Sequence, residues 1–362
     1  MATELTLPMS CDEGVYWNRE ADQELVCIDV RQETHDVKTF TFRARDDRYF
    51  SFDAGQYFLF ELEIDGEMVS RCYSLASSAL TPRSISITVK RVEGGKVSNW
   101  LHDHLKPGSA VRGTGPSGTF TLPGPAEGPY LLVSGGSGIT PVMSMVRALA
   151  DARRHPDIVF LHAARTPADL VFRDELLYRA KVTPNFRLLF LPERAGGEPG
   201  YAGVTGRVSE AFLKVAVPDL AERTVMCCGP APFMGAVRQL SLALGVKPER
   251  YFEESFDAAV IDEDDVPLPP AAEAASTFKV KFAKQDKVIE VGAEQSVLAA
   301  ARKSGVRLPS SCSNGLCGTC KSKLVSGSVD MKHNGGIRQR EVDAGFFLPC
   351  CSKPLSDLVV DR

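Results

Sequence analysis

Three of the ten cysteines of this chain lie within nine residues, at Cys312, Cys317 and Cys320. Their spacing, C-x4-C-x2-C, is used by [2Fe–2S] sites that take one more, distant thiolate. Two further cysteines, Cys350 and Cys351, are available for that position. Zinc is the alternative metal, but zinc sites favour paired C-x2–4-C spacings. Disulfides are disfavoured because the N-terminus lacks a secretory signal, which indicates a reducing cytoplasm. The cysteines therefore predict an iron–sulfur cluster.

The C-terminal segment around the cysteines resembles the plant-type ferredoxins. In that family the last ligand is followed, after a short gap, by a small or polar residue and then proline. The stretch "CCSKP" fits that register with Cys350 as the ligand, which leaves Cys351 as a structural residue. Small residues such as Gly315 and Gly318 let backbone amides approach the sulfides, and such hydrogen bonds tune the potential.

A phosphate-binding pattern occurs nearer the N-terminus. The stretch "RCYS" at Arg71–Ser74 is followed by a Gly-Gly turn and a predicted helix that starts at Ser98, and then by "GPSGTF". The first amide groups of a helix lack partners and lie at its positive end, so they bind phosphate. An ordinary surface arginine and a core tyrosine remain the alternative for "RCYS" alone.

In this order the three stretches resemble the flavin domain of the ferredoxin–NADP reductase superfamily. The resemblance implies that Arg71 holds the flavin phosphate, Tyr73 packs against the isoalloxazine and Ser74 offers its hydroxyl near N5. The "GPSGTF" stretch favours FAD over FMN. The residues that the resemblance places at the pyrophosphate are Lys96, Val97 and Ser98.

A second glycine-rich stretch, "LLVSGGSGITP", has the pattern of a strand that turns into a helix. We expect Thr140 to be the N-cap of that helix and Pro141 its first residue. Glycines such as Gly136 and Gly138 bring bare backbone amides against a pyrophosphate. The stretch is not the G-x-G-x-x-G fingerprint, so by itself it is a weak signal.

Together with "CCGPAPFM" and "EESF", this turn resembles the nicotinamide domain of the same superfamily. The resemblance implies that Ser74, Cys228 and Glu254 surround the hydride-transfer position, although Cys228 can equally be an inert buried thiol. Arg165 either accepts a 2′-phosphate or packs, and we favour NADH over NADPH. The cofactor-binding residues implied in this domain are Gly136, Gly138, Thr140, Arg165, Cys228, Gly229, Pro230 and, near the flavin, Phe256.

The elements that must position these residues lie in three parts of the sequence, each with its own hydrophobic pattern. Residues 24–124 alternate apolar and polar side chains in short runs, which predicts an antiparallel barrel or sandwich. Residues 125–256 alternate strands and helices, which predicts a parallel doubly wound sheet. In residues 277–362 a predicted hairpin and a helix from Ser296 precede the cysteines. We therefore expect a flavin-binding β-barrel, an α/β nicotinamide domain and an α+β ferredoxin domain of the β-grasp type.

Two further segments complete the predicted organisation, an N-terminal extension at 1–23 and a linker at 257–276. The linker carries six acidic residues, three prolines and no basic residue. The chain has a net charge of −4, but residues 277–362 hold 14 Lys/Arg and 8 Asp/Glu, a balance of +6 that leaves −10 for the rest. Opposite charges favour attraction between the two parts or steering of a charged partner; chance composition is the alternative. The sequence contains no run of 18 apolar residues, so it predicts no membrane-spanning helix.

Over nearly its whole length the chain resembles flavin and iron–sulfur reductases, most of all the reductase component of glycine betaine monooxygenase. That resemblance implies an oxidoreductase that passes electrons from NADH through FAD and [2Fe–2S], singly, to a Rieske-type oxygenase that demethylates a quaternary amine. Nucleic acid and membrane are not expected as partners. The alternatives are a reductase of the hybrid-cluster protein or of another oxygenase and, from another class, a flavin and iron–sulfur redox sensor.

Overall fold

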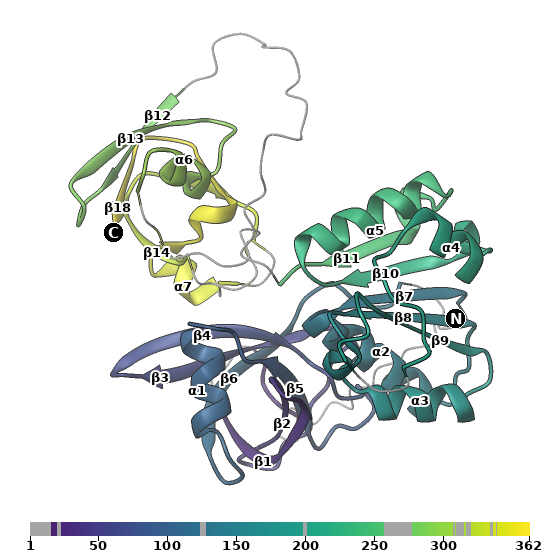
Figure 1. Ribbon diagram of the computed structural model, residues 1–362. Helices are drawn as coiled ribbons and strands as arrows, with labels where there is room; N and C mark the ends of the chain where they lie inside the picture. The colour runs from purple at the N-terminus through teal and green to yellow at the C-terminus, as the bar shows by residue number, and fades with distance from the viewer. Residues whose placement is uncertain are drawn as a thin grey trace. The chain divides into compact units, whose positions relative to one another are not determined.

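The computed structural model describes residues 16–19, 23–123, 128–197, 201–256, 277–306, 308, 315, 320–333, 336–337 and 339–362. It divides into two compact units, Met1–Phe256 and Asp257–Arg362 (Figure 1). The expected linker at 257–276 lies outside the described residues. In the ranges that are described, no helix combines the length and the apolar character needed to cross a membrane.

The first part of the N-terminal unit is an antiparallel sheet of six strands in the order β4-β3-β6-β1-β2-β5. An isolated bridge between Leu75 and Ile87 joins the region after β4 to β5, so the sheet closes as a barrel. Alternating side chains of β3, such as Phe58 and Phe60, fill its interior, as the sequence pattern predicts. The elements are β1 Gln23–Thr34, β2 Val37–Ala44, β3 Tyr57–Ile64, β4 Glu67–Ser74, β5 Ile85–Lys90, α1 Lys96–His104 and β6 Ala110–Ser117.

The second part of this unit is a parallel sheet of five strands in the order β11-β10-β7-β8-β9. Helices α2 and α3 cover one face, and α4 and α5 cover the other (Figure 1). Its central strands are buried on both faces, which is why they read as continuous apolar runs. The elements are β7 Tyr130–Gly135, α2 Ile139–Asp151, β8 Ile158–Ala164, α3 Arg173–Val182, β9 Phe186–Pro192, α4 Glu210–Ala216, β10 Thr224–Cys228, α5 Ala231–Ala243 and β11 Tyr251–Glu254.

The start of α2 differs from the prediction. A short 3₁₀ turn at Gly136–Gly138 runs directly into the helix, which begins at Ile139 with Gly138 at the cap position. Thr140 is therefore inside the helix, and its hydroxyl donates to the Ser137 carbonyl at 2.8 Å. The prediction of Thr140 as the N-cap is wrong because the glycines allow the backbone to turn earlier.

The C-terminal unit contains a mixed sheet of five strands in the order β13-β12-β18-β14-β16, with α6 beside it. The predicted hairpin and helix are present, and the Ser296 hydroxyl caps α6 by accepting from the Ala299 amide. The expected α+β arrangement is confirmed. The elements are β12 Thr277–Phe282, β13 Lys287–Gly292, α6 Val297–Lys303, β14 Ser322–Ser326, β15 Val329–Met331, α7 Gln339–Asp343, β16 Phe346–Phe347, β17 Ser352–Pro354 and β18 Leu358–Asp361.

Candidate functional site

The stretch "RCYS" forms the end of β4, against β3. Ser74 pairs with Tyr57 across the two strands and is buried. Tyr73 is half-buried, and its ring meets the edge of Phe60 with 6.0 Å between centroids. Burial raises the pKa of Tyr73 above its ordinary value, so its hydroxyl stays protonated. Arg71, Tyr73 and Ser74 thus lie at the C-terminal end of β4.

Helix α1 supplies the expected N-terminus, two residues earlier than predicted. It begins at Lys96 after Gly95, and among the described residues the Gly95 side of the helix has no side-chain cap. Ser98 is therefore not the first residue of the helix. Its hydroxyl accepts a hydrogen bond from the Val92 amide at 3.1 Å and so stabilises the preceding turn. Val97 and Ser98 are buried while Lys96 is exposed. First-turn amides without a side-chain cap fit a phosphate group.

The turn "GPSGTF" is held from outside by two side chains that the sequence did not single out. The Trp17 indole donates to the Gly115 carbonyl at 3.0 Å, and the Gln56 amide donates to the Gly118 carbonyl at 3.1 Å. Gly118 has φ +112°, and a Cβ there would lie 3.0 Å from the Tyr57 ring. A side chain at Gly118 would therefore be strained and crowded. The donors are distant in sequence from the turn, so no local pattern indicates them.

The glycine-rich turn after β7 packs directly on the end of β10. A Cβ at Gly138 would lie 2.2 Å from the Cys228 carbonyl oxygen, and one at Gly135 would lie 2.9 Å from the Phe233 ring. Only glycine permits this approach. Because β7 and β10 are neighbours whose connections leave in opposite directions, the turn lies at the switch point where open parallel sheets bind ligands.

The three residues assigned to hydride transfer come together. Cys228 and Glu254 are register partners at the ends of β10 and β11, so their side chains leave the same face of the sheet. The Ser74 hydroxyl donates to the Glu254 carboxyl group at 3.2 Å, across the two domains. Burial raises the pKa of Glu254 to about 8, although the Ser74 hydrogen bond acts against this. Glu254 can therefore hold a proton beside Ser74 near neutral pH.

A cavity of about 860 Å³ lies between the barrel and the parallel sheet, beside the glycine-rich turn after β7. Gly136 and Pro230 line one part of it, and Arg165 and Glu193 line the part at the ends of β8 and β9. Its size and mixed polar lining suit a dinucleotide. Arg165 is exposed, as is Phe256 just after β11. Of the remaining assigned residues, Gly229 is buried just after β10, and Thr140 is buried in the first turn of α2.

Two of the four assigned cluster ligands are described. Cys320 and Cys350 are buried in the C-terminal unit, and the Gly315 amide donates to the Cys350 sulfur at 3.2 Å. Such an amide–sulfur bond is what an iron-bound thiolate receives, so the described residues fit the cluster. Cys312 and Cys317 lie outside the described residues. Cys351 is half-buried, and its thiol donates to the Leu348 carbonyl.

Three family models match the chain in succession. The oxidoreductase FAD-binding domain matches residues 24–122, and the oxidoreductase NAD-binding domain matches residues 132–239. The 2Fe-2S iron-sulfur cluster binding domain matches residues 280–355. The order of the three matches agrees with the three parts of the sequence.

Several relatives match nearly the whole chain. The glycine betaine monooxygenase reductase subunit of Chromohalobacter salexigens is 43% identical over 346 residues, covering 92% of this chain and 94% of the relative. The stachydrine N-demethylase reductase subunit of Rhizobium meliloti is 35% identical over 339 residues, covering 94% and 96%. The crystal structure of phthalate dioxygenase reductase superposes with a TM-score of 0.57 at 26% identity, covering 94% of this chain and 98% of that chain.

Proposed function

We propose that this chain, which belongs to the family of oxidoreductases with FAD-binding, NAD-binding and 2Fe-2S domains, supplies electrons to a Rieske-type oxygenase. In this proposal the oxygenase demethylates a quaternary amine, because the chain resembles the reductase subunits of such oxygenases. The chain is an electron-transfer reductase. Its similarity over 92% of its length to a glycine betaine monooxygenase reductase subunit is the observation that carries the choice of acceptor.

When bound, nicotinamide supplies an electron pair as hydride, and FAD and the cluster pass the electrons on singly. The residues contribute orientation and a controlled environment. Arg71 and the α1 amides would hold the flavin phosphates, and the Gly136–Gly138 turn would hold the dinucleotide pyrophosphate. Ser74, hydrogen-bonded to Glu254, would orient the flavin ring edge and exclude water from it.

We assign the donor as NADH. Glu193 lines the end of the cavity beside Arg165 and forms an ion pair with Arg207, 3.4 Å between Glu193 Oε1 and Arg207 Nε. A carboxylate at this position favours a ribose hydroxyl over a phosphate, because two negative groups repel. A reductase in the same family is named NADPH oxidoreductase, so the donor depends on such residues and not on the fold.

The four cysteines Cys312, Cys317, Cys320 and Cys350 are our proposed cluster ligands. Thiolates at this spacing need a reducing compartment, and we place the protein in the cytoplasm. A redox sensor would need no efficient dinucleotide site, whereas rapid NADH-dependent reduction of cytochrome c is expected of a reductase.

The test of the proposed acceptor is reconstitution. Purified reductase and NADH should support demethylation of glycine betaine by a purified glycine betaine oxygenase component, and omission of the reductase should abolish it. A pull-down from the source cell identifies the natural acceptor. Rapid cytochrome c reduction without any support of demethylation would exclude this acceptor. Preferential transfer to a hybrid-cluster protein would select that alternative.

A further inference from the structure

The four residues Ser74–Ser77 of the barrel form a seam with the nicotinamide domain. Ser74 donates to Glu254 of β11 at 3.2 Å. The other two contacts come from α2: the Ser144 hydroxyl donates to the Ser77 carbonyl at 2.6 Å, and Arg147 Nη1 donates to the Ala76 carbonyl at 2.7 Å. Three hydrogen bonds between domains thus fall on one short stretch that begins at the assigned catalytic serine.

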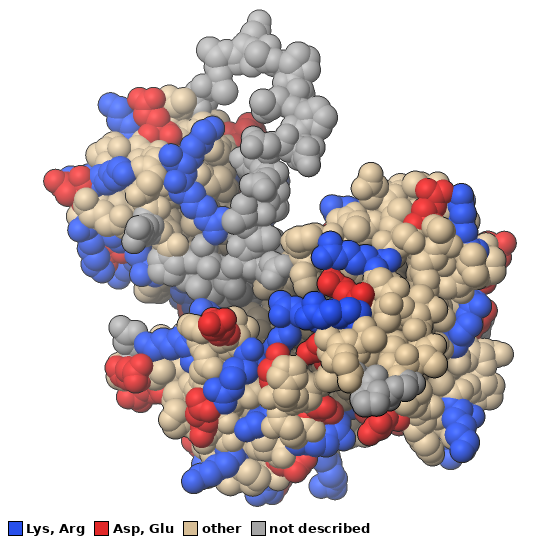
Figure 2. Space-filling view, in the orientation of Figure 1, with Lys and Arg blue, Asp and Glu red and all other residues tan. Residues whose placement is uncertain are grey.

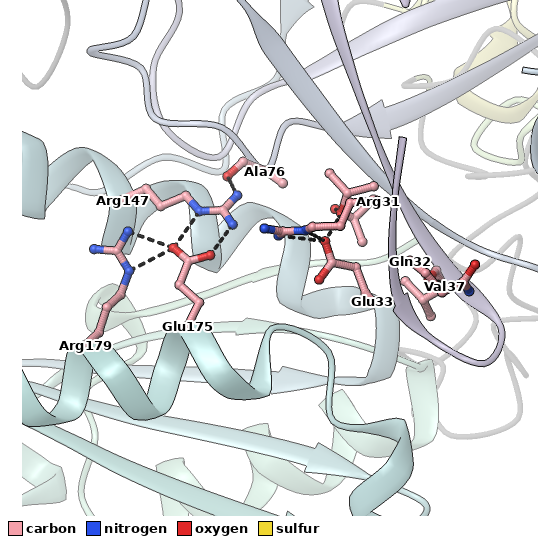
Figure 3. Close-up of polar contacts among 10 residues, drawn as sticks. Arg31, Gln32, Glu33, Val37, Ala76, Arg147, Glu175 and Arg179 are labelled. Atoms are coloured by element: carbon pink, nitrogen blue, oxygen red, sulfur yellow. Dashed lines mark hydrogen bonds and ion pairs between the residues drawn. The ribbon is translucent and has the colours of Figure 1, made fainter. Parts of the chain in front are cut away.

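Arg147 is held in place from its other side. Its Nε donates to Glu175 Oε1 of α3 at 3.0 Å, and its Nη2 donates to Glu175 Oε2 (Figure 3). The guanidinium carbon also lies 4.7 Å from the centroid of the Phe172 ring. The Arg147 side chain is 14% exposed, so it is ordered by its partners and shielded from solvent. A bidentate pair of this kind fixes both direction and distance.

Glu175 also accepts hydrogen bonds from a second arginine. Arg179, one turn further along α3, donates to the same carboxylate at 2.7 Å (Figure 3). Burial acts to raise the pKa of Glu175, but the hydrogen bonds and charges of the two arginines outweigh it and hold the pKa at about 2. Glu175 is therefore ionised near neutral pH, and its ion pair with Arg147 is retained there.

Helix α2 links this ion pair to the dinucleotide turn. It starts directly after Gly136–Gly138 and carries Ser144 and Arg147 in its second and third turns. With a rise of 1.5 Å per residue, Arg147 lies about 13 Å along the axis from Gly138. A helix does not shorten or bend easily over that length. A shift at the Ala76 contact therefore displaces the glycine turn relative to the barrel strand that ends at Ser74.

We propose that Arg147 is a positioning residue for hydride transfer. By joining the Ala76 carbonyl to Glu175, it fixes the domain that holds the nicotinamide against the strand that faces the flavin, and so sets the approach of the two rings. The inference rests on the proposed dinucleotide and flavin sites. It concerns a residue that touches neither cofactor in this assignment.

The experiment compares Arg147→Met with Arg179→Met in the full-length, cofactor-loaded protein. Among the described residues, Arg179 forms its side-chain hydrogen bonds with Glu175, so its loss weakens the same carboxylate pair without removing the Ala76 contact. In anaerobic stopped-flow mixing with NADH, we expect Arg147→Met to slow flavin reduction on the order of 10- to 100-fold. Its long-wavelength nicotinamide–flavin charge-transfer absorbance should also fall, with a smaller change in the Kd of NADH. Arg179→Met should resemble the wild type.

A structural readout accompanies the kinetics. Hydrogen–deuterium exchange of the protein before addition of NADH should increase at residues 75–80 in Arg147→Met and not in Arg179→Met. Ser144→Ala, which removes only the hydroxyl bonded to the Ser77 carbonyl, should change all readouts in the same direction but less. If Arg147→Met does not retain FAD, Ser144→Ala replaces it as the test variant.

Equal effects of the two arginine variants, or normal charge-transfer absorbance and flavin reduction in Arg147→Met and Ser144→Ala, would overturn the proposal. Failure of the proposed function is distinct, because it would appear in the wild type as a lack of flavin reduction by NADH.

Discussion

The two redox sites of this chain are built in different ways. The proposed hydride-transfer site joins Ser74 of a barrel strand to Glu254 of a parallel sheet, 180 residues apart, through a hydrogen bond between domains. The described part of the proposed cluster site lies within the C-terminal unit, where Cys350 accepts from the Gly315 amide. The first proposed site thus depends on the packing of two domains, and the second on residues of a single unit.

This difference determines how each site fails. A metal cluster depends on each of its ligands, because loss of one thiolate removes a bond that no neighbour replaces. A site made by packing loses rate when its geometry shifts, since catalysis depends steeply on the approach of the reacting atoms. We therefore expect all-or-none effects in the C-terminal unit and graded effects in the N-terminal unit.

The largest effect is expected for the assigned fourth ligand. Cys350→Ser should abolish the cluster absorbance and its EPR signal in the reduced protein, while reduction of the flavin by NADH stays nearly intact, because the ligand belongs to a separate unit. Cys351→Ser is the matched control and should keep the cluster. If the two variants behave the other way round, Cys351 is the ligand.

A large but not complete loss is expected for Gly138→Ala. The new Cβ would lie 2.2 Å from the Cys228 carbonyl oxygen, so the turn or the strand end must move. We expect the KM for NADH to rise and flavin reduction to slow strongly, with FAD and iron content unchanged. The control is Gly235→Ala on α5, where the new Cβ would meet no described atom within 4 Å apart from its chain neighbours and the nearby backbone of its own helix, and activity should be retained. Wild-type kinetics in Gly138→Ala would show that the approach is not needed.

A moderate effect should depend on pH through Glu254. Burial raises the pKa of its carboxyl group from 4.5 to about 8 in the folded protein. Between these values the folded state binds the proton and the unfolded state does not, so the contribution to stability falls as the pH rises through this window. The melting temperature of the wild type should therefore decrease, relative to Glu254→Gln, between pH 6 and pH 9. Parallel pH profiles of the two proteins would contradict the raised pKa.

The smallest effect concerns the charge difference between the two parts of the chain, +6 beyond residue 276 and −10 before it. Lys and Arg side chains are spread over the drawn face of the C-terminal unit (Figure 2). Exposed charges are screened over about 10 Å at 0.1 M salt and about 3 Å at 1 M. If attraction brings the units together, flavin-to-cluster transfer should slow as salt is added, while hydride transfer changes less. Rates independent of salt would make the charge difference incidental.

Local patterns predicted most of the elements. The period of two in β3 and the buried runs of β7 and β10 indicated their strands, and the Ser296 cap indicated α6. Helix starts were less accurate: α1 and α2 begin before Ser98 and Thr140, because glycine turns lead directly into both helices.

The joint between the domains was beyond prediction from the sequence. Its contacts pair residues from distant segments, such as Arg147 with the Ala76 carbonyl and Ser144 with the Ser77 carbonyl. A backbone carbonyl carries no residue-type signal, so no spacing in the sequence marks it as a partner. The assignment of Ser74 and Glu254 to one site came from resemblance to a family and not from their positions alone.

The central claim is the order of electron transfer, from NADH to flavin and then to the cluster. It is tested most directly by anaerobic stopped-flow mixing of the full-length protein with NADH, with absorbance recorded for both cofactors and EPR spectra taken of frozen samples. With one FAD and one [2Fe–2S] cluster per chain, flavin absorbance should fall first and the EPR signal of the reduced cluster should follow. Zinc in place of iron and sulfide, or reduction of the cluster by NADH in protein freed of FAD, would contradict it.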